Sequence, residues 1–282
     1  MNSLISKKIL KLKSSNGWNG VVARKWSDLV FAPAELIKNS NQIFKSEKGN
    51  ITLLKQIQGA NGSISFAVKK TVGASGIKWL IDYFRTPKSL RNFKLALLLK
   101  QNDIEVAEPV VAFWNLKENI YVTEYIPNSL NLYEIAFGKN IEIINNFSAK
   151  KAVVQKVAEI IAKLHKAGFW HRDSKAGNFI IYKEERDYKV KLIDLDGIKK
   201  NFISSGEKQI RTLANLAKTL TRFKTVNLAD LYRGFIIYCR AMEFNERQSK
   251  ELFRKIERAT VKLRLLTVLE ESKKFKEECP SK

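Results

Sequence analysis

One stretch in the second half of the chain restricts its fold more than any other, because charged and polar residues lie there between short apolar segments. It reads LHKAGFWHRDSKAGNFIIY over residues 164–182 and is followed by KVKLIDLDG over residues 189–197. The apolar runs FII and VKLI have the length and composition of short strands, and residues 183–189 form a charged hairpin between them. Such strands would fix both the polar loop before the first run and the acidic turn after the second.

The residue types in this stretch fit phosphoryl transfer. That reaction needs a carboxylate to orient the attacking hydroxyl and accept its proton, and a cation to offset charge on the moving group. It also needs a second carboxylate and an amide oxygen to hold Mg²⁺ against the nucleotide phosphates. Asp173, Lys175, Asp194 and Asn178 supply these groups in that order. We predict Asp173, Lys175 and the adjacent Arg172 as catalytic residues, with Asn178 and Asp194 as ligands of Mg²⁺ or Mn²⁺.

A structural alternative for these residues is a pair of plain turns, since Asp and Asn are common in turns. This alternative does not explain five residues at this spacing, after a helix that ends in Leu-His-x-x-Gly and before an Ile-Asp pair. The two histidines of the stretch fit structural roles better than catalytic ones. We expect His165 to pack at the helix end and His171 to bond to the backbone near the Asp194 turn.

The spacing of these residues resembles the protein-kinase catalytic loop, H-R-D-x-K-x-x-N, with an Asp where the D-F-G motif would begin. The flanking residues resemble a narrower family, the bacterial lipopolysaccharide kinases that act on Kdo or heptose of the inner core. Its signature is similar to L-H-x-x-G-x-x-H-R-D-x-x-x-x-N followed by I-D-x-D/G, which residues 164–178 and 193–196 follow. Weaker similarity, within a span of about residues 40–240, lies at residues 76–80, 87–93, 103–109 and 211–220.

The resemblance implies an α+β, two-lobe protein-kinase-like fold with a β-rich N-lobe and a mainly helical C-lobe. It implies ATP as phosphoryl donor and a Lys on the third strand for the nucleotide phosphates. Lys69 fits that place in an A-x-K pattern with Ala67 on the same face, although a slip of one residue would exchange it with Lys70. Glu124 is implied as the hinge residue that meets adenine through backbone groups.

Two departures from the kinase pattern concern the same half of the chain. Asn92 stands where kinases carry the helix Glu that pairs with the strand Lys, and residues 89–100 contain no carboxylate. The loop of residues 45–50 has a single glycine where a G-x-G-x-x-G motif is expected. Lys48 and the other lysine of this loop either cover the nucleotide phosphates or are simply solvated.

The apolar pattern changes near residue 126, from short alternating runs to helical spacing. Three strands of a meander are expected between residues 37 and 70, a helix at 89–100, and strands at 110–114 and 120–124. Beyond Pro127, Ser148 is the expected N-cap of a helix that Gly168 ends, and residues 207–278 are again helical. The predicted regions are a basic N-terminal extension at 1–35, an N-lobe at 36–126 and a C-lobe at 127–282.

The chain carries 51 Lys and Arg against 28 Asp and Glu, a net charge of +23, which predicts an anionic partner. Its two cysteines, far apart, fit a reducing compartment. No apolar run approaches the ~20 residues of a membrane span, and the basic N-terminus lacks the apolar region of a secretory signal. We expect a cytoplasmic protein, peripheral on the cytoplasmic face of the inner membrane, with ATP, an anionic glycolipid acceptor and the anionic membrane surface as partners.

Other functions stay open at this point. An atypical Ser/Thr protein kinase would use the same residues, and Arg172 fits it well, but no A-P-E follows Asp194 and the segment of residues 197–209 is short. A pseudokinase would not need Asp173, Asn178 and Asp194 together. A basic nucleic-acid-binding protein is disfavoured because the lysines and tryptophans follow no recognition motif. The acceptor sugar, Kdo or heptose, is left open.

Overall fold

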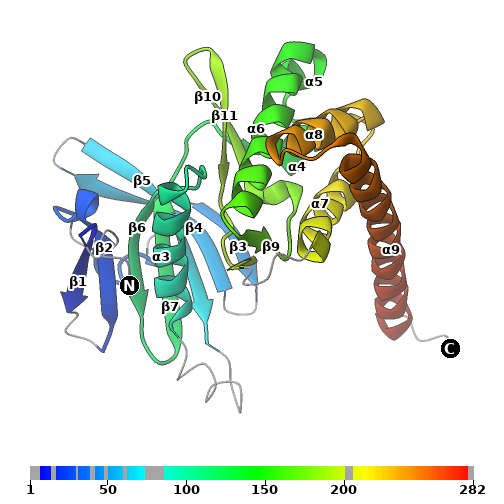
Figure 1. Cartoon of the computed structure of the whole chain (residues 1–282). Coiled ribbons are helices and arrows are strands. Elements are labelled where there is room, and N and C mark those ends of the chain that lie inside the picture. Colours follow the sequence, from blue (N-terminus) through cyan, green and yellow to red (C-terminus); the bar gives the residue numbers. More distant parts are fainter. Residues whose placement is uncertain are drawn as a thin grey trace. The chain divides into compact units, whose positions relative to one another are not determined.

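The computed structural model describes residues 7–13, 17–29, 31–38, 42–47, 50–59, 62–73, 86–200 and 206–278. The chain divides into two compact units, Met1–Pro127 and Asn128–Lys282, next to the boundary expected at residue 126. The first unit is built on a β-sheet and the second mainly on helices (Figure 1). Each unit has an apolar core of its own, so each is described by itself.

Seven antiparallel strands form the sheet of the first unit, in the order β1-β2-β6-β7-β5-β4-β3. Their bounds are β1 (Ile9–Lys13), β2 (Asn19–Ala23), β3 (Gln42–Glu47), β4 (Asn50–Gly59), β5 (Gly62–Val72), β6 (Pro109–Trp114) and β7 (Glu118–Glu124). The predicted meander is confirmed as β3-β4-β5. The expected N-terminal extension is corrected in part, because β1 and β2 pair with each other and β2 pairs with β6 as one edge of this sheet. A short 3-10 helix, η1 (Arg24–Trp26), follows β2.

The two faces of this sheet bury different clusters. Phe66, Val68 and Val122 lie in the cluster on one face. On the other face, α3 (Lys88–Gln101) places Phe93 against Tyr121 and its neighbours. The Ser89 hydroxyl fixes the start of α3 by donating to the carbonyl of Phe113 at 2.8 Å. The helix expected at residues 89–100 is thus confirmed.

The second unit contains six α-helices and five short strands among the residues that the structure describes. The helices are α4 (Leu132–Phe137), α5 (Ile141–Asn145), α6 (Phe147–Lys166), α7 (Gly206–Leu220), α8 (Leu228–Ala241) and α9 (Glu246–Glu278). The strands β8 (Leu130–Asn131), β10 (Phe179–Glu184) and β11 (Asp187–Leu192) form one sheet, and β9 (Phe169–His171) pairs with β12 (Ile198–Lys200). A 3-10 turn, η2 (Ala176–Asn178), precedes β10.

The long helix α6 carries the buried apolar stripe that its spacing predicts. Its N-cap is corrected from Ser148 to Asn146, whose side-chain oxygen accepts from the Ala149 N–H at 3.1 Å. Gly168, with φ of +77°, turns the chain into β9 after the C-cap Ala167. The prediction for His165 is confirmed, because it is buried at the helix end with Nδ1 2.8 Å from the Tyr238 hydroxyl.

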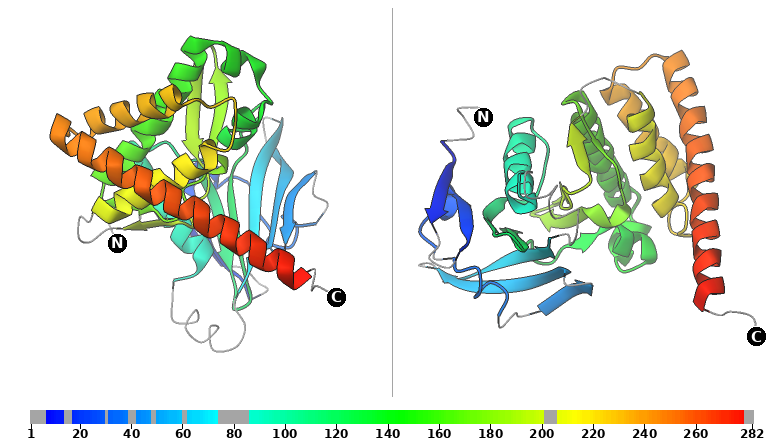
Figure 2. Two further views of the ribbon diagram at one scale, coloured as in Figure 1. Left: turned by 90° about the vertical axis from the view of Figure 1, so that its right-hand side faces the viewer. Right: turned by 90° about the horizontal axis from the view of Figure 1, so that it is seen from below.

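Helices α7, α8 and α9 confirm the helical character expected beyond residue 207. Helix α8 packs on α6, and α9 packs along α7 (Figure 2). No helix in the described part of the chain is both long enough and apolar enough to cross a membrane.

Candidate active site

The catalytic loop follows β9, and a strand pair holds it beside the acidic turn. In this pair His171 lies opposite Ile198. The Arg172 N–H then donates to the Gly197 carbonyl at 2.9 Å. Residues 171–173 are therefore brought next to residues 194–197, although more than 20 residues separate them in sequence. The sequence predicted the strands β10 and β11 that follow the loop, but not the pair β9–β12 that makes this juxtaposition.

The imidazole of His171 connects the two segments. Its Nδ1 lies 3.3 Å from the Asp173 amide, and its Nε2 lies 3.1 Å from the Asp194 carbonyl. Burial lowers the pKa of this ring, so it is neutral at physiological pH. Because Nδ1 accepts from an N–H, the single ring proton sits on Nε2 and is donated to the Asp194 carbonyl. The scaffold role predicted for His171 is confirmed.

Gly197 is needed for the histidine to occupy this place. A Cβ at this position would lie 2.5 Å from Cε1 and 2.6 Å from Nδ1 of His171, far inside van der Waals contact. Any other residue would displace either the ring or the turn. The glycine therefore acts through close packing rather than through an unusual backbone angle.

Asn178 is a third residue of the site that is held beside His171. Its Nδ2 donates to the Asp173 carbonyl at 3.1 Å and lies 3.1 Å from Nε2 of His171. Its own carbonyl accepts from the Ile193 N–H at 2.9 Å, which ties the start of β10 to the chain just before Asp194. These bonds fix the side-chain amide, so that Oδ1 rather than Nδ2 is the atom that can bind a metal.

The predicted metal ligands fit a magnesium or manganese ion that is bound together with a nucleotide. Asn178 offers an amide oxygen and Asp194 a carboxylate, the hard oxygen donors that Mg²⁺ prefers. Among the residues that the structure describes, no group of three or more His, Cys, Asp or Glu side chains could hold a metal ion. Two protein oxygens leave most of the coordination shell to phosphate and water, as is usual for nucleotide-bound Mg²⁺.

Asp173 and Lys175 form an ion pair with 2.7 Å between Oδ2 and Nζ. The two side chains are 54% and 56% exposed, so the pair contributes at most about 1 kcal/mol to stability. Each charge can therefore change its partner at little cost when a substrate binds. The Arg172 side chain is also exposed, whereas its backbone is held at both ends.

Helix α7 supports the loop through three polar side chains. Asn215 donates to the Arg172 carbonyl at 2.8 Å, and the Thr212 hydroxyl donates to the His171 carbonyl at 3.2 Å. The Thr219 hydroxyl accepts from the Ala176 N–H at 3.2 Å. Sequence reasoning missed these supports as parts of the site. The signal for Asn215 was present in the R-x-x-x-N-L pattern of residues 211–220, but that pattern does not indicate what the side chain contacts.

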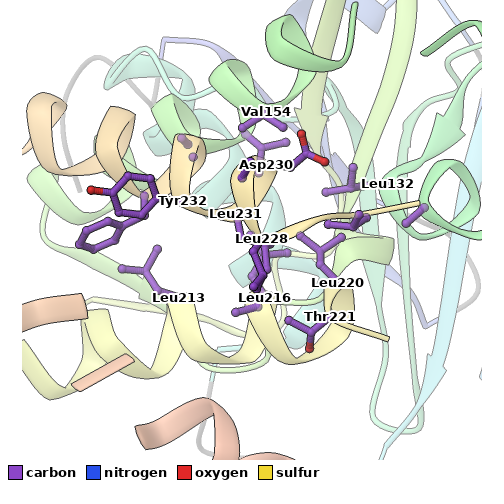
Figure 3. Close-up of a pocket in the computed structure, with 18 of the residues that line it drawn as sticks. Leu132, Val154, Leu213, Leu216, Leu220, Thr221, Leu228, Asp230, Leu231 and Tyr232 are labelled. Carbon is purple, nitrogen blue, oxygen red and sulfur yellow. The ribbon is translucent and has the colours of Figure 1, made fainter. Parts of the chain in front are cut away.

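An apolar cavity of about 650 Å³ lies on the neighbouring face of α7 (Figure 3). Leu213, Leu216 and Leu220 project into it from this helix. Asp230 also lines it, with its carboxylate held by Lys150 at 2.5 Å and by Arg233 at 3.1 Å. These partners satisfy the buried charge of Asp230, and no residue of the catalytic loop lines the cavity.

The strand register of the first unit shows which of two adjacent lysines, Lys69 or Lys70, lies on the face of the sheet that α3 covers. Lys69 pairs across the sheet with Tyr121, a member of the cluster under α3, so Ala67 and Lys69 lie on that face. Lys70 lies on the opposite face and forms an ion pair with Glu118 at 2.5 Å. This register agrees with the choice of Lys69, whose contact with nucleotide phosphates stays a prediction.

The remaining nucleotide-site residues stay predictions. The Glu124 N–H donates to the Glu108 carbonyl, and its carboxylate accepts from the Glu108 N–H, each at 3.0 Å. Glu124 thus closes the end of β7 with its side chain, and its N–H is engaged within the sheet. Asn92 is buried in α3 at the expected place of the helix Glu. Lys48 lies outside the described residues.

The fold and the loop together define the class of this chain, which has a protein-kinase-like fold. One solved structure with this fold is described as WaaP in complex with acyl carrier protein, with a TM-score of 0.59 and 18% identity over 85% of this chain and 95% of that one. Another is the crystal structure of the BubR1 kinase domain, with a TM-score of 0.51 and 12% identity over 94% and 86% of the two chains. The two structures confirm the expected α+β, two-lobe kinase-like architecture.

The sequence comparisons narrow the class to a family. Residues 75–255 match the sequence model of the lipopolysaccharide kinase (Kdo/WaaP) family, and the chain belongs to this family. A curated relative is the 3-deoxy-D-manno-octulosonic acid kinase of Vibrio parahaemolyticus serotype O3:K6 (strain RIMD 2210633), 27% identical over 150 residues. That alignment covers 52% of this chain, and it spans only 56% of the relative's length. The resemblance stated from the motifs is thereby confirmed.

Proposed function

We propose that this protein is an ATP-dependent kinase that phosphorylates a sugar hydroxyl of the lipopolysaccharide inner core, on Kdo or heptose. The observation that carries the proposal is the buried imidazole of His171, which is bonded to the backbone N–H of Asp173 and to the backbone carbonyl of Asp194, while the Asn178 side chain donates to the Asp173 carbonyl. These bonds hold the backbone of both aspartates, so that two carboxylates and one amide are kept close together. Membership of the lipopolysaccharide kinase family supports the sugar acceptor.

In the proposed reaction, Asp173 orients the acceptor hydroxyl and takes its proton as the bond to phosphorus forms. Lys175, 2.7 Å from Asp173 in the described structure, turns to the transferred phosphoryl group and offsets its charge. Asn178 and Asp194 hold the divalent ion, which would neutralise phosphate charge when it is bound. Lys69 is proposed to contact the nucleotide phosphates. His171 remains neutral and acts only on the position of the loop.

The proposed place of action is the cytoplasmic face of the inner membrane, without a span. The net charge of +23 and an anionic, lipid-anchored acceptor both favour attraction to an acidic leaflet. The absence of a membrane-spanning helix among the described residues is compatible with peripheral binding. Binding is expected to weaken as salt screens the attraction.

The test is phosphate transfer from labelled ATP, with Mg²⁺ or Mn²⁺, to separate acceptor pools. These are an oligosaccharide ending in Kdo, a core extended with heptose, a casein-like protein, and buffer alone. Label on a sugar acceptor that disappears in Asp173→Asn supports the proposal. We expect the Kdo acceptor to be labelled first, because the relative found is a Kdo kinase. Label on the protein acceptor alone would instead favour the atypical protein kinase.

A further inference from the structure

The outer face of α9 is a surface that the proposed reaction does not use. The inner face of this helix contacts α8 through Phe253, whose ring lies 5.2 Å from that of Phe235. It also contacts α7, where Lys218 donates to the Thr267 hydroxyl at 3.4 Å. Figure 2 shows α9 along one edge of the helical unit, with α7 on its inner side. On the opposite face of α9, the side chains that the structure describes as far as residue 270 are exposed.

Helical spacing places two kinds of residue on this outer face. Arg254 and Arg258 are followed, at spacings of three and four, by Val261, Leu265 and Val268. The apolar side chains are strongly exposed, with 53% of Val261, 60% of Leu265 and 60% of Val268 accessible to solvent. One helical face thus changes from basic to apolar in the direction of the C-terminus.

The positive charges of the basic residues on this face are available to an anionic partner. The ion pairs described along α9 join Lys250 with Glu246 and Lys255 with Glu251. Within the described part of the chain, Arg254, Arg258 and Lys262 form none of the ion pairs observed. A short apolar stripe beside such charges is one part of the pattern of a helix that lies in the interface of a membrane.

We propose that the outer face of α9, residues 254–268, docks the protein on an anionic lipid bilayer. Arg254, Arg258 and Lys262 would contact lipid phosphates, while Val261 and Leu265 would enter the boundary between headgroups and acyl chains. The inference rests on the proposed function, since a lipid-anchored acceptor has to be met at a membrane surface. It assigns the membrane contact to one helix, whereas the overall charge only predicts attraction.

A second copy of the chain is a less suitable occupant of this face. Two α9 helices side by side in parallel would bring like charges at Arg254 and Arg258 together. An antiparallel pair would place these arginines against Val261 and Leu265 and bury charge without a partner. Nucleic acid would use the arginines but leave the apolar stripe in water. A bilayer with acidic headgroups satisfies both parts of the face.

The test is co-sedimentation with vesicles of phosphatidylcholine alone and of equal parts phosphatidylcholine and phosphatidylglycerol. In one variant, Arg254, Arg258 and Lys262 are changed to Gln. Its matched control carries Lys151, Lys156 and Lys163, which are exposed on α6, changed to Gln, so that both lose three positive charges. Each basic residue at an acidic surface is worth about fivefold in affinity, so we expect about a 100-fold loss in the α9 variant. The α6 control should lose only a few-fold.

A second pair of variants tests the apolar stripe. Val261→Ser with Leu265→Ser should weaken binding about 10-fold or more, since two branched side chains no longer enter the bilayer. Ile141→Ser with Leu228→Ser, two residues 70% and 80% exposed elsewhere in the unit, is the control and should bind like the wild type. Equal binding of the α9 variants and their controls overturns the proposal. The proposal is also overturned if the wild type sediments as a dimer, the serine pair makes it monomeric, and vesicle binding is unchanged.

Activity on a soluble, deacylated core oligosaccharide separates this inference from the proposed function. The α9 variants should phosphorylate that acceptor at the wild-type rate, because α9 contributes none of the residues of the catalytic loop. They should lose rate only when the acceptor is presented in anionic vesicles. If the wild-type protein binds vesicles through α9 but phosphorylates no sugar, the docking proposal is supported and the proposed function is contradicted.

Discussion

The two units of this protein differ in how completely they carry the kinase pattern. The second unit holds every catalytic-loop residue at the expected spacing, with the backbones of Asp173 and Asp194 bonded to His171 and that of Arg172 bonded to α7. The first unit keeps Lys69 on the face covered by α3 but has Asn92 in place of the helix Glu. The comparison indicates that a buried network fixes the loop geometry in one unit, whereas in the other unit the proposed nucleotide contact rests on the face that the strand register gives to Lys69.

The largest effect is expected from the proposed base in the second unit. Asp173→Asn keeps the shape of the side chain but removes the proton acceptor, so turnover should fall about 10²–10⁴-fold while ATP binding stays nearly unchanged. Single-turnover kinetics with a core-oligosaccharide acceptor measures this. Asp194→Asn is the contrasting variant, in which metal binding and turnover should fall together. Wild-type turnover in Asp173→Asn would contradict the assignment on which the comparison rests.

A smaller effect is expected in the first unit. A charged hydrogen bond contributes about 1.5–3 kcal/mol, so Lys69→Ala should lower kcat/KM by about 10–100-fold. Lys70→Ala removes only the ion pair with Glu118 on the other face of the sheet and should keep most of the activity. Initial rates over a range of ATP concentrations distinguish the two. The reverse order would show that the face covered by α3 is not the nucleotide side.

The close packing at Gly197 can be tested through stability as well as through activity. Gly197→Ala forces a methyl group against the His171 ring, and overpacking of this kind costs typically about 1–3 kcal/mol in the free energy of unfolding. Gly177→Ala is the matched control in the same loop, because a Cβ there meets nothing within 4 Å. Thermal unfolding and turnover of both variants should separate them. Equal behaviour would mean that the ring has room to move.

The smallest effect concerns the histidine at the end of α6. Burial lowers the pKa of His165 from 6.5 to about 3, so between these values the folded state binds fewer protons than the unfolded state. Its contribution to stability is complete above pH 6.5 and is lost as pH falls through that window. We expect about 1 kcal/mol per pH unit between about pH 6 and 4 from this residue, measured by urea unfolding.

A double variant, His165→Leu with Tyr238→Phe, is the control for this pH dependence. It removes both partners of the 2.8 Å hydrogen bond, so no buried hydroxyl is left alone. The remaining slope should come from the carboxylates and from His171, whose pKa burial also lowers. An unchanged slope in the double variant would show that His165 does not resist protonation in the folded protein.

The sequence predicted the residues of the site better than it predicted their supports. Asp173, Asn178 and Asp194 occur at a spacing that chemistry restricts, so the pattern identified them. Thr212 and Thr219 act through bonds to residues about 40 positions away, and no local pattern indicates such contacts. Long-range partners of this kind depend on tertiary packing, which a single sequence does not specify.

The two differences between the predicted and the observed fold also have local causes. The run ILKLK of β1 carries lysines at alternate positions, which we interpreted as part of a basic N-terminal extension although alternation is also the pattern of an edge strand. Asn146 and Ser148 are both good N-caps, and the extended backbone of Asn146 decides between them. In both cases the composition allowed two structures, and pairing or capping partners selected one.

Helix α7 has a consequence for how mutations combine. Its polar side chains Thr212 and Asn215 hold the catalytic loop, while Leu213 and Leu216, each one position further on, line the apolar cavity. A substitution that repacks the cavity therefore shifts the same helix that the loop rests on. Effects of cavity and loop substitutions should not add, as is usual for residues that share a rigid element. Natural variation in the cavity would then tune the catalytic loop without changing any residue in it.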